Sequence, residues 1–326
     1  MGSTGLLNYI FRKLIQIPVL LFGVIVAVFA MVRLAPGDPV ATLIGDSPAT
    51  PEYVAELREY LGLDRPVHEQ FVLYLSNLLR GDFGDSYYYS ASVLDLILER
   101  LPPTLLLMGS GLLVATVIGV ALGVVAAARV NSPLDAGANI FAVVGYSLPV
   151  FWLGELALLV FALQLNWFPT GGMTAVRDNP EGIFAVFDRV HHLALPALVL
   201  ATRYIAIDFR LTRSEVLEVL SQDYILWARA KGIPSRLIMF RHALRNALLP
   251  VVTITGLNVG FALSGAVLTE VVFSWPGLGR LTLDAISHRD YSVLTGIFIF
   301  VTIGVIVINF ITDVLYAAID PRIRLR

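Results

Sequence analysis

Side chains capable of chemistry are scarce in this sequence, and those present form no recognisable catalytic pattern. The 326 residues include no cysteine and only two lysines, which excludes disulfides, thiolate nucleophiles and cysteine-based metal sites. Lys13 precedes Leu14 and Lys231 precedes Gly232, so neither lysine can belong to a G-x-x-x-x-G-K-[ST] nucleotide loop. The H-E-x-x-H and G-x-S-x-G motifs are also absent. We therefore predict no catalytic, cofactor-binding or metal-binding residue.

The histidines give only a weak indication of a metal site. Five are present, and two of them, His191 and His192, are adjacent. Adjacent residues on a helix point about 100° apart, so the pair cannot readily face one metal ion. We expect both side chains to be solvated near a membrane interface.

Several polar side chains fall inside apolar segments, where they are costly. A charged side chain at the centre of a bilayer costs ~2.5–3.5 kcal/mol on insertion scales. Glu270 and Asp313 lie near segment ends and are expected to be hydrated. Glu155 is deeper and should face protein or a water-filled path, either touching cargo or pairing with a neighbour such as Arg203. Asn258 could likewise line a path or bond between helices.

The elements that carry these residues are expected to be membrane spans. The chain is 57% hydrophobic and 15% charged, against about 25% charged residues in soluble domains, and its mean hydropathy is +0.77. About 20 apolar residues cross a bilayer core of ~30 Å. We predict an all-α integral membrane protein with six transmembrane helices, over residues 11–33, 101–128, 138–163, 193–212, 246–272 and 291–317.

The N-terminal segment is predicted to be retained as the first span. Arg12 and Lys13 precede its apolar run. That run is longer than the ~7–15 apolar residues of a secretory signal, and no small-residue cleavage site follows it. Pro36, Gly37 and Pro39 are expected to end the helix.

The distribution of basic residues predicts the orientation of the chain. Arginine and lysine gather at both termini and between the fourth and fifth spans, whereas residues 35–98 carry ten acidic residues and three arginines. By the positive-inside rule, both termini and residues 213–245 are cytoplasmic, and residues 35–98 form a long folded external loop. In this loop, Thr50 should cap a helix that starts at Pro51, and a second, amphipathic helix should end at Gly81.

The stretch from Tyr224 to Pro250 is basic, amphipathic and rich in small residues. Ser221 or Asp223 can cap a short helix that runs from Tyr224 to about Lys231. The side chains of Tyr224, Ala228 and Lys231 share one helical face.

The small residues of this stretch, and the residues that end its first helix, suggest a contact surface. Ala228 and Ala230 would let another surface approach closely. Gly232 is expected to take the left-handed conformation that ends a helix, and Pro234 prevents its continuation. A second helix is predicted from Arg236 to Ala247. An ordinary interfacial helix anchored on anionic lipid is the alternative.

This stretch resembles a known motif. Residues 228–232 (ARAKG), followed by residues 242–250 (HALRNALLP), are similar to the EAA motif of ATP-binding-cassette importer permeases, in the form found in the dipeptide/oligopeptide/nickel family. Leu226, Trp227 and Ala228 stand where the generic motif has Glu-Ala-Ala. Further matching stretches lie at residues 36–39 (PGDP), 61–66 (LGLDRP), 81–84 (GDFG), 273–280 (FSWPGLGR), 313–316 (DVLY) and 320–322 (DPR).

The resemblance implies a fold and a set of partners. The chain would be a single transmembrane permease domain over residues 1–326, with the type I ABC importer permease fold, and the first of two permease subunits. Its partners would be a second permease subunit, two ATP-binding-cassette ATPases, an external solute-binding protein and the lipid bilayer, with no nucleic acid. ATP and Mg would bind to the ATPases, and this chain would have no cofactor and no enzymatic activity. The location would be a bacterial or archaeal plasma (inner) membrane.

The resemblance also implies which residues couple ATP hydrolysis to transport. The cytoplasmic coupling helix would dock on an ATPase through Tyr224, Ala228, Arg229, Ala230, Lys231 and Gly232. The expected cargo is a di- or oligopeptide, with nickel, glutathione or another small solute as alternatives. An ion-coupled secondary transporter that uses Glu155 and Asp208 is the alternative of another class, although the sequence shows no inverted repeat with paired broken helices.

Overall fold

The computed structural model describes residues 3–34, 40, 44, 50–60, 64–175 and 181–319. Residues 36–39, 61–63 and 320–322, which carry three of the family-like stretches in whole or in part, and the side chain of Asp313 lie outside the described residues. The prediction that Pro36, Gly37 and Pro39 end the first helix therefore stays a prediction.

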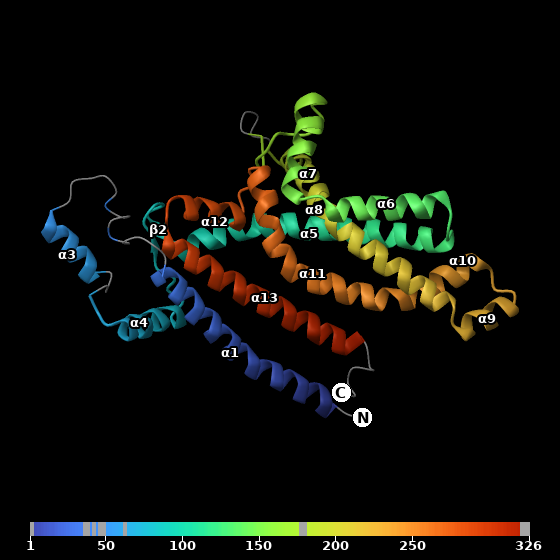
Figure 1. The fold of residues 1–326 in the computed structure, drawn as a ribbon, viewed down its shortest axis with the longest axis horizontal. Coiled ribbons are helices and arrows are strands. Elements are labelled where there is room, and N and C mark those ends of the chain that lie inside the picture. The colour runs from blue at the N-terminus through green and yellow to red at the C-terminus, as the bar shows by residue number, and fades with distance from the viewer. Residues whose placement is uncertain are drawn as a thin grey trace. The chain divides into compact units, whose positions relative to one another are not determined.

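The described residues are mostly helical, as predicted (Figure 1). The α-helices are α1 (Ser3–Leu34), α3 (Pro51–Tyr60), α4 (Val67–Leu79), α5 (Val93–Ala128), α6 (Pro133–Ser147), α7 (Val150–Ala157), α8 (Ile183–Leu220), α9 (Asp223–Ala230), α10 (Ser235–Leu237), α11 (Leu244–Val272), α12 (Leu278–Ser287) and α13 (Tyr291–Ile319). Two π-helices, η1 (Leu158–Gln164) and η2 (Ile238–Ala243), continue α7 and α10.

The fold divides into two compact units. The first consists of Met1–Ile10, Pro102–Arg280 and Val307–Arg326, and the second of Phe11–Leu101 and Leu281–Ile306. The single domain expected over residues 1–326 stays a prediction.

Several helices are suited to crossing a membrane. Among the described residues, Val93–Ala128, Ile183–Leu220, Ser235–Gly260 and Tyr291–Thr312 are long and apolar enough. The bent pair Pro133–Ser147 and Val150–Gln164 would be a fifth span, and Ile15–Met31 within α1 is a shorter apolar helix. Five of the six predicted segments overlap one of these helices, and the third, residues 138–163, overlaps the bent pair; the six membrane crossings themselves stay a prediction.

The third predicted segment, residues 138–163, is not one continuous helix. Its two halves meet at an angle of 105°, and Figure 1 shows α7 turning away from α6. Pro149 explains the break, because proline has no amide hydrogen to donate and disfavours the helical conformation in the preceding residue. Leu148 is accordingly extended, with φ −75° and ψ 134°.

Two other helices extend beyond their predicted segments. α5 begins at Val93, inside the loop predicted for residues 35–98, and runs through Pro102 and Pro103. α8 begins ten residues before its predicted span of residues 193–212 and ends eight residues after it. Hydropathy identifies the part of a helix that can lie in lipid, but it gives no signal for polar turns that continue the helix outside.

The second unit contains both helices predicted for the external loop. The amide of Tyr53 donates to Oγ1 of Thr50 at 3.4 Å, as a cap before α3 should. α4 ends before Gly81, which has φ +80° as expected. Two short antiparallel strands, β1 (Asp85–Ser86) and β2 (Ala91–Ser92), were not predicted.

Close packing of α5 against α8 in the first unit depends on two glycines. A Cβ atom on Gly119 would lie 2.7 Å from Cβ of Asp208, and one on Gly123 would lie 2.7 Å from Cβ of Thr212. Such a small-xxx-small spacing lets helix backbones approach closely in membranes. The approach brings Oγ1 of Thr116 on α5 within 3.0 Å of the buried Asp208 carboxylate.

The prediction that Glu270 is hydrated is wrong. Its side chain is fully buried in the first unit. Oε1 accepts a hydrogen bond from Thr104 Oγ1 at 2.7 Å, and Oε2 accepts from the amides of Gly279 at 2.7 Å and Arg280 at 3.2 Å. Thr104 Oγ1 in turn accepts from the amide of Leu278 at 2.8 Å. The carboxylate thus receives free amides at the start of α12, where a helix favours negative charge.

The FSWPGLGR stretch is built around this carboxylate. A Cβ atom on Gly277 would overlap the carboxyl group of Glu270, so only glycine fits there. Trp275 is fully buried, and its Nε1 donates to the carbonyl oxygen of Pro103 at 2.8 Å. Neither α12 nor the structural role of this stretch was predicted from the sequence.

Candidate functional site

The segment predicted to be cytoplasmic, residues 213–245, forms two short helical pieces between the end of α8 and the start of α11 (Figure 1). The first is α9. The second is α10 with η2, which continues directly into α11. The prediction that two separate helices replace a simple turn here is confirmed.

The caps predicted for α9 are wrong. Its N-cap is Gln222, with no side-chain hydrogen bond, and Asp223 is its first residue. Ser221 belongs to the end of α8, where its hydroxyl donates to the carbonyl oxygen of Glu218 at 2.7 Å. The longer α8 therefore uses the serine that would otherwise cap α9, while Asp223 still places a negative charge in the first turn.

The C-terminus of α9 is built as expected. Gly232 has φ +76°, a conformation that is costly for residues with a Cβ atom. Its amide donates to the carbonyl oxygen of Arg229 at 2.9 Å, and the Ile233 amide donates to that of Ala228 at 3.2 Å. This pair of bonds is the Schellman motif, which turns the chain sharply after the helix.

One face of α9 is seated on the protein itself. Ile225 and Ala228 are buried against Ile238 of η2, with Leu220 and Ile233 at the edge of the cluster. The prediction that Ala228 leaves room for another surface is therefore wrong. Its place in the Schellman motif turns it toward Ile233, a contact that commonly accompanies this motif.

A side-chain hydrogen bond also fixes α9 to α11. Nδ2 of Asn246 donates to the hydroxyl oxygen of Tyr224 at 2.9 Å. The Tyr224 side chain remains 44% exposed. Tyr224 thus holds α9 in place while keeping part of its ring available.

The opposite face of α9 presents large apolar and basic side chains. Trp227 is 69% exposed and Leu226 is 55% exposed. Arg229, Ala230 and Lys231 are exposed beside them. Leu226 and Trp227 were absent from the predicted contact residues, although they occupy the first two positions of the family-like motif.

The end of α8 that leads to α9 is firmly held. Nε and Nη2 of Arg213 donate to the two carboxylate oxygens of Asp135 at 2.7 and 2.8 Å. Asp135 lies in the first turn of α6 and also accepts from the amide of Asn131 at 3.0 Å. This two-pronged geometry is specific for guanidinium and carboxylate. It ties the first turn of α6 to α8, ten residues before the start of α9.

The two candidate path residues are not brought together by any described hydrogen bond or ion pair. Glu155 is exposed on α7, and Asn258 is 9% exposed on α11. Arg203 does not pair with Glu155; its guanidinium carbon lies 5.3 Å from the ring centroid of Tyr146.

The histidine pair is only partly as predicted. His191 is exposed, but His192 is buried, with Nδ1 2.9 Å from the carbonyl oxygen of Asp188. Within the described part of the chain, no group of three or more His, Cys, Asp or Glu side chains is placed to hold a metal ion.

Comparison with known proteins identifies the family. Residues 119–325 match "Binding-protein-dependent transport system inner membrane component", and residues 6–108 match the N-terminal region of such components. The chain is 41% identical to the di/tripeptide transport system permease protein DppB of Pseudomonas aeruginosa, with 98% of this chain and 99% of that protein covered. It is 43% identical to the oligopeptide transport system permease protein AppB of Bacillus subtilis, with 97% and 98% covered.

A solved structure supports the fold. The MetNI methionine ABC transporter, in an inward-facing conformation, contains a chain with 18% identity and a TM-score of 0.54, covering 70% of this chain and 97% of that one. The apolar helices and the bacterial relatives make this a multi-pass inner-membrane protein. Since the family matches span most of the sequence and relatives align over nearly its whole length, the chain belongs to the family of binding-protein-dependent transport system inner membrane components.

Proposed function

We propose that this chain is one of two permease subunits of an ATP-driven importer that takes up di- and oligopeptides delivered by an external binding protein. The observation that carries this proposal is the alignment, at 41% identity and over 98% of the chain, with a di/tripeptide transport permease. The family assignment favours this function over an ion-coupled secondary transporter.

In the proposed topology the chain crosses the membrane six times, with both termini in the cytoplasm. Residues 35–98 are external and offer a surface to the binding protein. Two ATPase subunits bind ATP and Mg on the cytoplasmic side, and this chain contributes positioning and a path through the membrane. The clustering of basic residues in residues 213–245 supports this orientation.

The exposed face of α9 is the proposed contact with the ATPase. To change the ratio of inward-open to outward-open populations from 1:99 to 99:1, a partner must bind one state about 5.5 kcal/mol more favourably than the other. An exposed ion pair contributes only about 0–1 kcal/mol. Trp227 and Leu226 supply exposed apolar area, and tryptophan is over-represented among residues that dominate interface energies. The buried face formed by Ile225 and Ala228 keeps α9 attached when it is pushed.

The proposal is tested by purification and reconstitution. The tagged chain is extracted from its native membrane in mild detergent, and the accompanying proteins are identified by mass spectrometry. We expect a second permease, ATPases with nucleotide loops and a binding protein, and uptake of labelled peptide by proteoliposomes only with Mg-ATP. Uptake of nickel or glutathione without peptide uptake would replace the proposed cargo. A chain purified alone that transports without ATP would overturn the proposal.

Trp227→Ser should release the ATPase from the purified complex. Removing a large central contact residue typically costs 2 kcal/mol or more, so we expect ATPase affinity to fall by about tenfold or more. The measurement is binding of purified ATPase to the permease pair. Trp167→Ser is the matched control, because Trp167 is 60% exposed but lies outside the coupling segment. Equal binding by the two variants would remove Trp227 from the docking surface.

A further inference from the structure

α8 carries two arginines on one face within an apolar segment. Arg203 and Arg210 are seven residues apart, which is two helical turns or about 10 Å along the axis. Both side chains are exposed on this chain. In the described part of the chain, neither guanidinium pairs with a carboxylate; the other basic residue of this helix end, Arg213, is already held by Asp135.

The position of Arg203 requires water or a partner. It lies at the middle of the segment predicted to cross the membrane, residues 193–212, where an arginine facing lipid costs at least ~2.5–3.5 kcal/mol. Charged side chains at this depth almost always face the bundle interior or a water-filled cavity. The face of α8 that carries Arg203 and Arg210 is therefore assigned to an aqueous path rather than to lipid.

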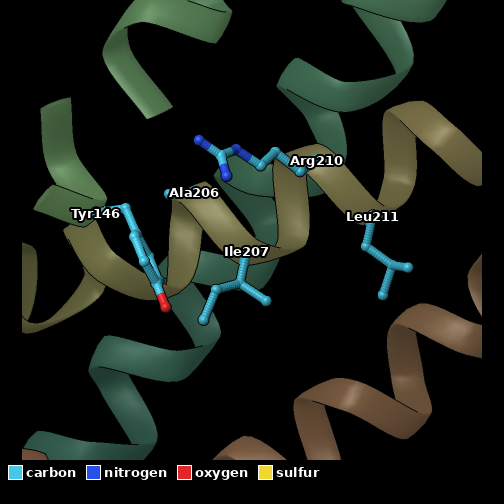
Figure 2. Close-up of a pocket in the computed structure, with 5 residues that line it drawn as sticks. All are labelled: Tyr146, Ala206, Ile207, Arg210 and Leu211. Atoms are coloured by element: carbon cyan, nitrogen blue, oxygen red, sulfur yellow. The ribbon is translucent and has the colours of Figure 1, made fainter. Parts of the chain in front are cut away.

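An open pocket lies along the same face. It has a volume of about 400 Å³ and is lined by Tyr146, Ala206, Ile207, Arg210 and Leu211, a size within the usual range for small-ligand sites. Figure 2 shows the Arg210 side chain extending along α8 toward the Tyr146 end of the pocket. The ring of Tyr146 also meets Arg203, whose guanidinium carbon lies 5.3 Å from its centroid.

The chemistry of this pocket suits an anionic group on a small molecule. A guanidinium binds a carboxylate through two parallel hydrogen bonds, a geometry that a lysine cannot reproduce. Contact with the Tyr146 ring orients Arg203 without neutralising it. Two such groups a short distance apart along one helix can bind an anion in succession, and multiple weak sites allow a permeating solute to enter and leave.

We infer that Arg203, Arg210 and Tyr146 form a site for the terminal carboxylate of the transported peptide. This inference rests on the proposed function, because every linear peptide carries that group whatever its side chains. The site would provide one contact common to cargo of different sequence. Ile207 and Leu211 supply apolar surface beside it for the rest of the molecule.

The test compares two cargoes that differ only in charge. Proteoliposomes containing the complete importer and its binding protein take up labelled Ala-Ala-Ala or its C-terminal amide, with wild type, Arg203→Gln, Arg203→Lys and Arg210→Gln. The binding protein's own preference for either cargo is the same in every sample and cancels in the ratio of variant to wild type. Arg129→Gln, at an exposed arginine in the loop before α6, is the control. Assembled complex is quantified for each variant.

We expect Arg203→Gln to reduce uptake of the free acid by about tenfold or more and to leave uptake of the amide within about twofold. Uptake of the free acid by Arg203→Lys should lie between that of wild type and that of Arg203→Gln. Arg210→Gln should also lose uptake of the free acid while keeping uptake of the amide. Equal loss for acid and amide in correctly assembled Arg203→Gln and Arg210→Gln complexes would overturn the inference. So would failure of both variants to assemble with the second permease, which would assign the arginines to that interface. Absence of peptide uptake by wild type would instead overturn the proposed function.

Discussion

Gly232→Val will abolish ATP-driven uptake while the chain still inserts into the membrane. Gly232 has φ +76° at the C-terminus of α9, and a β-branched residue held in that region costs about 1–3 kcal/mol. A Cβ atom there would meet nothing within 4 Å, so the penalty comes from the backbone and not from a clash. Opening of the turn relieves this cost and moves the exposed face of α9 out of the proposed ATPase contact. Uptake per assembled complex is the measurement.

Gly232→Asn separates backbone conformation from the simple loss of glycine. Asparagine tolerates the left-handed region better than other residues with a Cβ atom, so this variant should retain much of the uptake. Gly232→Val should also show weakened ATPase binding, as Trp227→Ser does. Normal uptake by Gly232→Val would refute the assignment of α9 as the coupling helix.

Glu270→Ala will lower the stability of the chain more than any other single substitution proposed for it. Its removal leaves the amides of Gly279 and Arg280 without their acceptor at the start of α12 and breaks the 2.7 Å hydrogen bond from Thr104. Each unsatisfied buried donor costs about 1–3 kcal/mol, so a total loss of about 3–5 kcal/mol is expected. Thermal unfolding in detergent and the amount of chain in the membrane measure this effect.

Glu155 provides the matched control, because it is also a carboxylate in an apolar segment but is exposed. Glu155→Gln should leave the unfolding temperature unchanged, whereas Glu270→Gln should lower it, since an amide cannot accept from all three donors without losing one bond. Altered uptake by Glu155→Gln would place that side chain on the path. Equal unfolding temperatures for Glu270→Ala and wild type would contradict the capping role of Glu270.

The sequence predicts the parts of this fold that have a strong local signal. Apolar length locates the long helices, and Thr50, Gly81 and Gly232 mark helix ends because each residue type has a distinct backbone or capping role. The resemblance of residues 228–232 and 242–250 identifies the family and the site to be tested. All of these signals lie within a few residues of the structure that they predict.

Features that depend on distant contacts could not be predicted in the same way. Glu270 looked like a hydrated terminal carboxylate because its donors Thr104, Gly279 and Arg280 come together only in the folded chain. Ala228 looked available because helical spacing does not say which face is covered by Ile238. Pro149 is itself a local signal for a helix break. The prediction of a single span over residues 138–163 rested on apolar length alone.

The two-hydrogen-bond ion pair between Arg213 and Asp135 has a mechanical consequence. It joins the first turn of α6 to the end of α8, so a movement of α9 under the proposed function would be transmitted to α6 through direct side-chain contacts. α6 ends at the 105° bend before Pro149, and hinge motion is usually absorbed by a few residues at such element ends. The bend is thus a candidate hinge between α6, which is joined to α8, and α7, which follows it. Tyr146 lies three residues before Pro149 and contacts Arg203, so in the proposed mechanism a movement that starts at the ATPase contact would shift a residue beside the arginines of α8.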